Sequence, residues 1–156
     1  MGNVYLICGK ICAGKSTYAK KLAEEKNAVI LSVDEVTTLF AKDLGEQHDE
    51  IALRVRQYLM EKAVRIAQCG CPVILDWGFW TKAMRRDADS FFRSRGIAPA
   101  WHYLDVSDAV WAERISQRNL CPGQADYVVN EGLKQKCLQL FEPPQRGEIT
   151  VWHTVE

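Results

Sequence analysis

The 156-residue sequence has little of what marks proteins that span membranes or coat nucleic acid. It carries no excess charge, because 20 Lys and Arg balance 20 Asp and Glu, and therefore has no overall field to attract nucleic acid or an anionic membrane. No apolar run reaches the roughly 20 residues needed to cross a bilayer, and no signal-peptide pattern is present. From these absences we expect a cytoplasmic protein without membrane contact.

Internal repeats, low-complexity tracts and long linkers are also missing, so we expect residues 1–156 to form a single domain. A chain of this length buries roughly two-thirds of its unfolded surface, which is enough for one core. The six cysteines are scattered rather than paired in a recognisable framework. In a cytoplasmic protein this scatter favours free thiols.

The most informative segment is residues 9–17 (GKICAGKST), here called the phosphate-binding loop. It matches the pattern G-x-x-x-x-G-K-[ST] and directly follows an apolar run. Its glycines let the backbone turn so that N–H groups face phosphate oxygens, and the next helix presents the positive end of its dipole. In this pattern Lys15 reaches the β- and γ-phosphates of a nucleoside triphosphate, and the Ser16 hydroxyl binds Mg²⁺. The predicted nucleotide contacts in the loop are Gly9, Lys10, Ile11, Cys12, Ala13, Gly14, Lys15, Ser16 and Thr17.

Short apolar strands alternate with longer helical stretches, which indicates β-α-β units and a parallel sheet covered on both faces. The expected strands are 4–8, 28–33, 72–76, 100–105 and 148–153. Between the second and third, apolar residues recur at helical spacing and predict one apolar face. They are Ile51, Val55, Tyr58, Leu59, Ala63 and Ile66.

Further helices are expected from the N-cap Thr81 to Gly96 and from Ser107 to about Asn119, followed by a short lid at 119–127. The predicted fold class is α/β: a three-layer α/β/α sandwich with a mainly parallel five-stranded sheet, of the P-loop NTPase type found in nucleoside and nucleotide kinases. In such open sheets ligands bind beyond the carboxyl ends of the strands, so functional residues should follow each strand.

Asp34 follows the second expected strand. If that strand neighbours the first, Asp34 faces the terminal phosphate, where a carboxylate can accept the proton of an attacking hydroxyl. It is therefore a candidate both for catalysis and for contact with the acceptor. The alternative is that Asp34 only caps a helix starting at Glu35.

Asp76 ends the apolar run of the third expected strand and is a candidate Mg²⁺ ligand together with Ser16. The alternative is a turn-forming Asp before Gly78. Trp77 and Trp80 follow at once and are candidates for stacking on the acceptor at the mouth of the cleft. Their alternative role is to pack the strand end against its helix.

Arginines on two expected helices are candidates for binding phosphate or substrate. Arg114 and Arg118 are four residues apart, on one helical face next to the expected lid, where they can neutralise charge on the transferring phosphate. Arg85, on the preceding helix, is a candidate contact for the acceptor. The alternative for all three is a solvated helix face.

Over nearly its whole length the chain resembles small P-loop kinases of the "AAA domain, type 33" class, relatives of chloramphenicol phosphotransferase, gluconate kinase, zeta toxin and polynucleotide kinase. The resemblance is carried by residues 9–17, 32–34, 73–80 and 102–106, by Arg114, Arg118 and Asn119, and by residues 141–144.

This resemblance implies transfer of the γ-phosphoryl group of ATP to a hydroxyl, with ATP and Mg²⁺ as cofactors. Asp34 matches the catalytic carboxylate of these kinases, Arg118 matches their lid arginine, and Arg114 takes a nucleotide-contacting position. The implied catalytic residues are therefore Asp34, Lys15 and Arg118. The lid at 119–127 departs from the pattern, because it is short and contains no arginine of its own.

The expected acceptor is a hydroxyl of a small molecule such as a nucleoside, a sugar or an antibiotic-like compound. A polynucleotide 5′-hydroxyl stays open as an alternative, since a single-strand end needs few contacts, although the sequence has no basic stripe to track phosphates. A regulatory module that hydrolyses ATP slowly and moves its lid is the second alternative. A shared scaffold does not choose among these acceptors.

Overall fold

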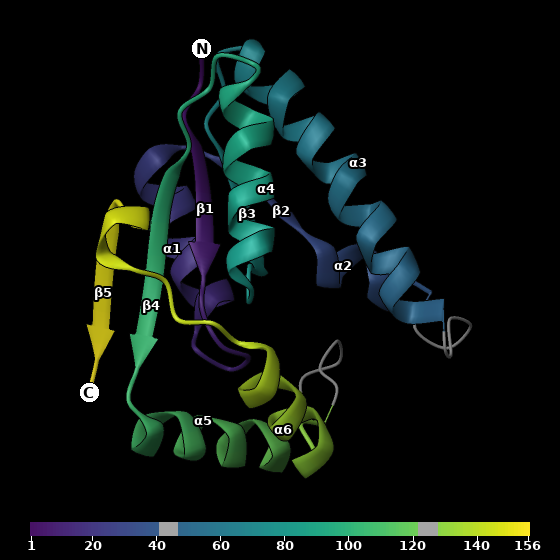
Figure 1. Cartoon of the computed structure of the whole chain (residues 1–156), viewed down its shortest axis with the longest axis vertical. Helices are drawn as coiled ribbons and strands as arrows, with labels where there is room; N and C mark the ends of the chain where they lie inside the picture. The colour runs from purple at the N-terminus through teal and green to yellow at the C-terminus, as the bar shows by residue number, and fades with distance from the viewer. Residues whose placement is uncertain (41–46, 122–127) are drawn as a thin grey trace.

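The computed structural model describes residues 1–40, 47–121 and 128–156. Five parallel strands form one sheet in the order β2-β3-β1-β4-β5 (Figure 1). The strands are β1 Val4–Cys8, β2 Val29–Ser32, β3 Val73–Gly78, β4 Ala100–Val106 and β5 Val151–Val155. Every residue of the central strand β1 is buried, as expected for a parallel sheet with helices on both faces.

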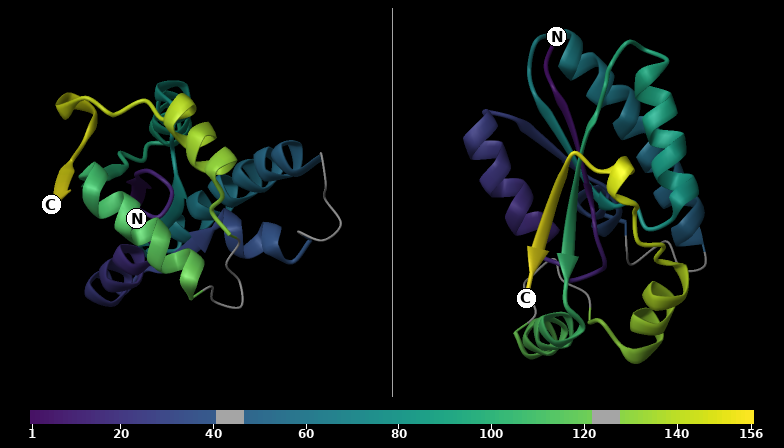
Figure 2. Two further views of the ribbon diagram at one scale, coloured as in Figure 1. Left: turned by 90° about the horizontal axis from the view of Figure 1, so that it is seen from below. Right: turned by 60° about the vertical axis from the view of Figure 1, so that its left-hand side comes forward.

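Helices cover both faces of the sheet and its carboxyl edge. On one face lies α1 (Lys15–Lys26), and on the other lie α3 (His48–Gln68) and α4 (Lys82–Arg93) (Figure 2). Across the carboxyl ends of the strands lie α5 (Asp108–Leu120) and α6 (Glu131–Leu140) (Figure 1). The predicted α/β/α sandwich is therefore confirmed.

Side-chain caps fix the starts of α4 and α5. The hydroxyls of Thr81 and Ser107 each accept a hydrogen bond from the N–H three residues later, at 3.1 and 3.4 Å. Such a bond satisfies one of the free N–H groups of a first helical turn. The predicted N-cap Thr81 and the predicted helix start at Ser107 are thus confirmed.

The sheet differs from the sequence expectation in two respects. β2 pairs with β3 rather than with β1. The prediction that Asp34 faces the terminal phosphate assumed that these two strands, β1 and β2, are neighbours, and this assumption is wrong. β5 begins at Val151 because the 3₁₀ turn Arg146–Glu148 occupies the start of the expected strand.

The helices differ in two respects as well. α3 buries Ala52, Leu59 and Ala63, whereas Tyr58, predicted for the same face, is 58% exposed. The helix α6 was not predicted, because it buries Cys137 alone and so lacks a clear apolar stripe. In the part of the chain that is described, no helix is both long and apolar enough to cross a bilayer.

Candidate active site

The phosphate-binding loop joins β1 to α1 and leaves a row of N–H groups open to an anion. Gly14 is the N-cap of α1 with φ of 90°, a left-handed conformation that favours glycine. Within the described ranges, the backbone N–H groups of Gly14, Lys15 and Ser16 donate no hydrogen bond to the chain. Free N–H groups at a helix start form an anion-binding cradle.

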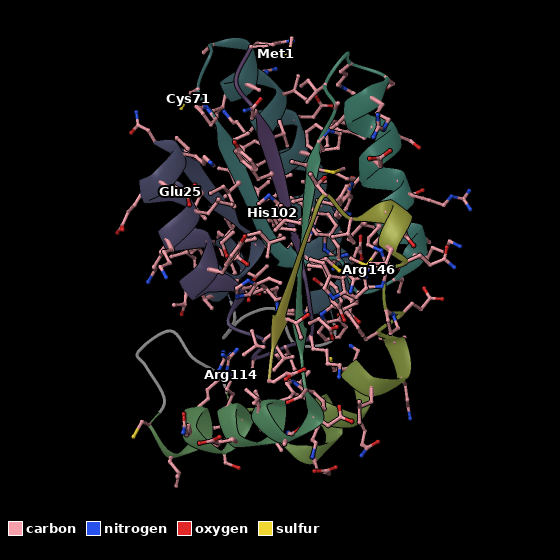
Figure 3. The ribbon with its side chains drawn as sticks, turned by 90° about the vertical axis from the view of Figure 1, so that its left-hand side faces the viewer. Met1, Glu25, Cys71, His102, Arg114 and Arg146 are labelled. Carbon is pink, nitrogen blue, oxygen red and sulfur yellow. The ribbon has the colours of Figure 1, made fainter. Side chains whose placement is uncertain are left out.

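Side chains of α5 hold the opposite, carbonyl side of this loop. Trp111 Nε1 donates to the carbonyl of Ile11 and Arg114 Nη1 to that of Ala13, both at 2.6 Å. Figure 3 shows Arg114 extending from α5 toward the loop. The Arg114 guanidinium lies so close that a Cβ added to Gly14 would come within 2.9 Å of it. These contacts occupy the loop carbonyls, whereas the N–H groups stay available.

Arg118 lies one turn beyond Arg114 on α5, and its Nη1 is 3.5 Å from the Cys12 sulfur. Both predicted arginines therefore reach the phosphate-binding loop rather than solvent alone. Of the lid expected at 119–127, Asn119 and Leu120 form the end of α5 and Cys121 caps it, and residues 122–127 lie outside the described ranges.

Lys15 folds back on its own loop. Its Nζ donates to the carbonyl of Lys10 at 2.6 Å. Burial lowers the pKa of Lys15, and the negative charges of Asp76 and Asp34 oppose this shift. The ammonium group thus lies near two carboxylates and is bound by one carbonyl that a phosphate oxygen could replace.

Asp76 and Ser16 lie together beside Lys15. Burial raises the pKa of Asp76, while Lys15 and a hydrogen bond with Ser16 lower it. A buried carboxylate beside a hydroxyl supplies the hard oxygen donors that Mg²⁺ prefers, so these residues fit the ion. Asp76 pairs within β3 to strands on both sides, so the alternative of a turn-forming Asp is wrong.

Asp34 belongs to the short helix α2 (Val33–Thr38), and Ser32 is its N-cap. The Ser32 hydroxyl accepts the N–H of Glu35 at 3.5 Å, so the capping alternative for Asp34 is wrong. The Asp34 side chain is exposed in the first turn. Its charge nevertheless acts on both Lys15 and Asp76 across β3.

Trp77 and Trp80 are half-buried, so packing accounts for part of each indole. Trp77 packs against both hydrophobic clusters, with its ring 5.0 Å from that of Phe79. Trp80 packs against the main core. Contact of either indole with an acceptor stays a prediction.

Arg85 does not have the surroundings expected of an acceptor contact. Its side chain is only 3% exposed and its Nε pairs with Glu148 at 2.9 Å. Its Nη1 donates to the carbonyls of Phe79 and Glu142 at 3.1 and 2.9 Å. We therefore correct the sequence expectation: Arg85 joins chain segments in the protein interior.

Three residues near the site make interactions that the sequence did not indicate. Trp111 holds the phosphate-binding loop, as described above. Asn119 accepts the N–H of Val129 at 2.9 Å and donates to its carbonyl at 2.8 Å. Arg56 on α3 lies within electrostatic reach of Asp34. Their partners are distant in sequence, so no local pattern could reveal them.

Comparison with known proteins identifies the family. The model of the AAA domain family matches residues 4–144. No curated protein matches the chain. Solved structures with the same fold include a sugar kinase from Janibacter sp. HTCC2649, with TM-score 0.67 and 19% identity, covering 99% of this chain and 86% of that chain.

Two further solved structures share the fold. The APS kinase of Mycobacterium tuberculosis, in complex with AMPPNP and APS, has TM-score 0.70 and 19% identity, covering 99% of this chain and 89% of that chain. A gluconokinase from Sinorhizobium meliloti 1021 has TM-score 0.66 and 18% identity, covering 99% and 81%. The chain therefore belongs to the AAA domain family, and its fold is that of P-loop kinases.

Proposed function

We propose that this protein is an ATP-dependent kinase that transfers the γ-phosphoryl group to a hydroxyl of a small molecule. The observation that carries the proposal is the convergence of Lys15, Asp76 and Asp34, which come from three different elements. Lys15 and Asp76 act on each other's pKa, and the charge of Asp34 acts on both. A nucleotide-binding site alone needs the first two. The exposed carboxylate of Asp34 adds a group suited to a second substrate.

Nucleotide binding follows from the free donors of the phosphate-binding loop. The N–H groups of Gly14, Lys15 and Ser16 are directed by the start of α1, where the helix dipole also favours an anion. We propose that Lys15 exchanges the Lys10 carbonyl for β- and γ-phosphate oxygens when ATP binds. A charge-assisted hydrogen bond to phosphate is stronger than one to a neutral carbonyl.

Ser16 and Asp76 are the proposed Mg²⁺ ligands. When bound there, Mg²⁺ neutralises charge on the phosphate oxygens. The raised pKa of Asp76 shows that burial disfavours its ionised form in the free protein. A bound cation would favour the carboxylate, so binding of Mg²⁺ should be coupled to release of any proton that Asp76 holds.

Transfer requires an acceptor oxygen to attack the γ-phosphorus in line with the departing ADP. We propose that Asp34 accepts the hydroxyl proton while the new O–P bond forms and the bond to the β-γ bridging oxygen breaks. Arg118, which already contacts the phosphate-binding loop at Cys12, is positioned to neutralise charge on the transferring group.

The comparisons support the class of reaction and leave the acceptor open. A sugar kinase, a gluconokinase and an APS kinase share this fold, and the last was solved with AMPPNP. Dependence on ATP also fits the cytoplasmic location expected from the sequence. The balanced net charge of the chain supports a small acceptor over a polynucleotide.

The substitution Asp34→Asn tests the assignment of the base. We expect it to slow transfer at least about 100-fold, because a carboxamide cannot accept the proton. The dissociation constant for Mg–ATP should change less than about threefold, since no nucleotide contact is lost. Glu35→Gln, one residue later in the same exposed turn, is the matched control and should keep both properties. Transfer that survives Asp34→Asn would contradict the proposal.

A further inference from the structure

The cationic side chain of Arg56 lies on the face of α3 that is otherwise packed with apolar residues. Ala52, Leu59 and Ala63 are buried on this helix, and Arg56 falls between them at the same spacing of three and four residues. Ala52 and Leu59 form a cluster with Val33 of α2. Arg56 therefore stands on the face of α3 that packs toward α2, where its neighbours along the helix are apolar.

No described residue pairs directly with Arg56. Arg56 is half-buried, and burial lowers its pKa, opposed by Asp49 and then Asp34. Within residues 1–40, 47–121 and 128–156, Arg56 makes no hydrogen bond or ion pair. The carboxylate of Asp49 is 81% exposed and lies 3.5 Å from Lys136 of α6, so it is already engaged.

Arg54, on the same helix, provides a comparison for the lack of a direct partner at Arg56 among the described residues. Arg54 is 73% exposed, yet its guanidinium pairs with Glu50 at 2.6 Å. Charged side chains taken out of water are normally paired, whereas exposed ones need no partner. Here the exposed arginine is paired, whereas the half-buried one has no such partner in the part of the chain that the structure describes. Because arginine does not lose its proton in proteins, Arg56 presents a permanent positive charge to which an anion can bind.

The packing of α2 on α3 places Arg56 near the proposed acceptor site. Val33 of α2 clusters with Ala52 and Leu59, which flank Arg56 on α3, and Asp34 is the next residue of α2. In agreement with this packing, the charge of Asp34 acts on both Lys15 and Arg56. Lys15 belongs to the phosphate-binding loop and Arg56 to α3. A molecule whose hydroxyl is held at Asp34 for transfer can therefore extend toward α3 and Arg56.

We infer that Arg56 binds an anionic group of the acceptor, so that the substrate is a small hydroxylated molecule carrying a carboxylate, phosphate or sulfate. This inference rests on the proposed kinase function and names its substrate class. The guanidinium fork suits the planar carboxylate and the tetrahedral oxyanions equally, because both accept two parallel hydrogen bonds.

Calorimetry on the full chain saturated with Mg–AMPPNP tests this inference without requiring turnover. The probes are D-gluconate and D-ribose 5-phosphate, with D-glucitol and D-ribose as their neutral counterparts, and inorganic sulfate. Wild type should bind at least one anionic probe about tenfold or more tightly than its counterpart, and Arg56→Gln should remove the preference. Arg56→Lys should restore part of it, since lysine keeps the charge without the fork.

Arg54→Gln is the matched control and should leave the preference unchanged. Thermal melting of each variant shows that it is folded, and Arg56→Lys carries the test if Arg56→Gln unfolds. Equal affinity for charged and neutral probes, no binding of the anions, or a preference that survives Arg56→Gln would each overturn the inference.

Transfer of the γ-phosphoryl group is measured in the same samples to separate the two claims. Anion binding that depends on Arg56 without any phosphoester product would leave the anion site standing and the kinase proposal wrong. Efficient phosphorylation of a neutral acceptor by Arg56→Gln would leave the kinase proposal standing and the inference wrong.

Discussion

Arg85 joins segments that are far apart in the sequence. It pairs with Glu148 and donates to the carbonyls of Phe79 and Glu142, so one guanidinium connects the end of β3, the segment after α6 and the turn before β5. Its contribution is structural, yet it lies beside the strand end that carries Asp76. A buried charge of this kind is stabilising only while its partners are present.

Arg85→Gln should lower the free energy of unfolding by about 3 kcal/mol, because it removes one partner of a buried ion pair and breaks bonds to the backbone. Urea unfolding measures the change. Arg86→Gln is the matched control, since Arg86 is exposed and adjacent, and should alter stability by less than about 0.5 kcal/mol. Equal stability of the two variants would contradict the structural role of Arg85.

Asp76 provides a prediction about pH at the same scale. Burial raises its folded-state pKa above the ordinary value of 3.8. Between the ordinary pKa, which applies to the unfolded chain, and the higher folded-state pKa, the folded protein binds more protons than the unfolded chain. The free energy of unfolding therefore falls as the pH rises through this window. Above the window, the cost of the buried carboxylate is present in full.

Asp76→Asn removes that charge with little change of shape and should raise the free energy of unfolding at pH 7. The gain over wild type should shrink as the pH falls through the folded-state pKa toward 3.8. Urea titrations at a series of pH values without Mg²⁺ measure it. A variant less stable than wild type at pH 7 would show that attraction to Lys15 outweighs burial.

At the scale of elements, α5 connects the phosphate-binding loop to α6. The middle of α5 holds the loop through Trp111, and its end holds Val129, two residues before α6, through Asn119. The Asn119 side chain bonds both the N–H and the carbonyl of Val129. This arrangement joins the end of α5 to the chain just before α6.

Asn119→Ala should expose the Val129 amide and accelerate its hydrogen exchange about tenfold, the effect of losing one net hydrogen bond. Exchange followed by NMR or mass spectrometry provides the measurement. The control is Gln117→Ala, because Gln117 is exposed and bonds Glu113 on its own helix. An unchanged rate at Val129 would mean that Asn119 does not hold this end.

Elements were predictable where their signals are local. Thr81 and Ser107 indicate helix starts because each caps the N–H only three residues later. Residues 9–17 contain a complete motif in one segment. α6 was missed because its single buried residue, Cys137, provides no periodicity. The position of β2 beside β3 was missed because strand order depends on packing of whole elements.

At the scale of the whole molecule, parallel strands bring their carboxyl ends to one edge, and this edge assembles the site (Figure 1). Lys15 could be predicted from its sequence motif, and Asp76 and Asp34 because they end or follow expected strands. Arg56 and Arg85 could not be assigned from the sequence, since their roles depend on burial and on partners far along the chain. Sequence reasoning therefore proposed candidates for the chemistry of the site, but it did not indicate the residues that hold the surrounding segments together.

The destination of a labelled γ-phosphoryl group tests the central claim most directly. The full chain is incubated with γ-labelled ATP, Mg²⁺ and a panel of sugars, sugar acids, nucleosides, antibiotics and 5′-hydroxyl oligonucleotides. We predict that the label enters a small-molecule phosphoester with wild type and Glu35→Gln and not with Asp34→Asn. Label found only in inorganic phosphate, whatever hydroxyl compound is present, would contradict the kinase assignment and favour a nucleotide-hydrolysing regulatory module.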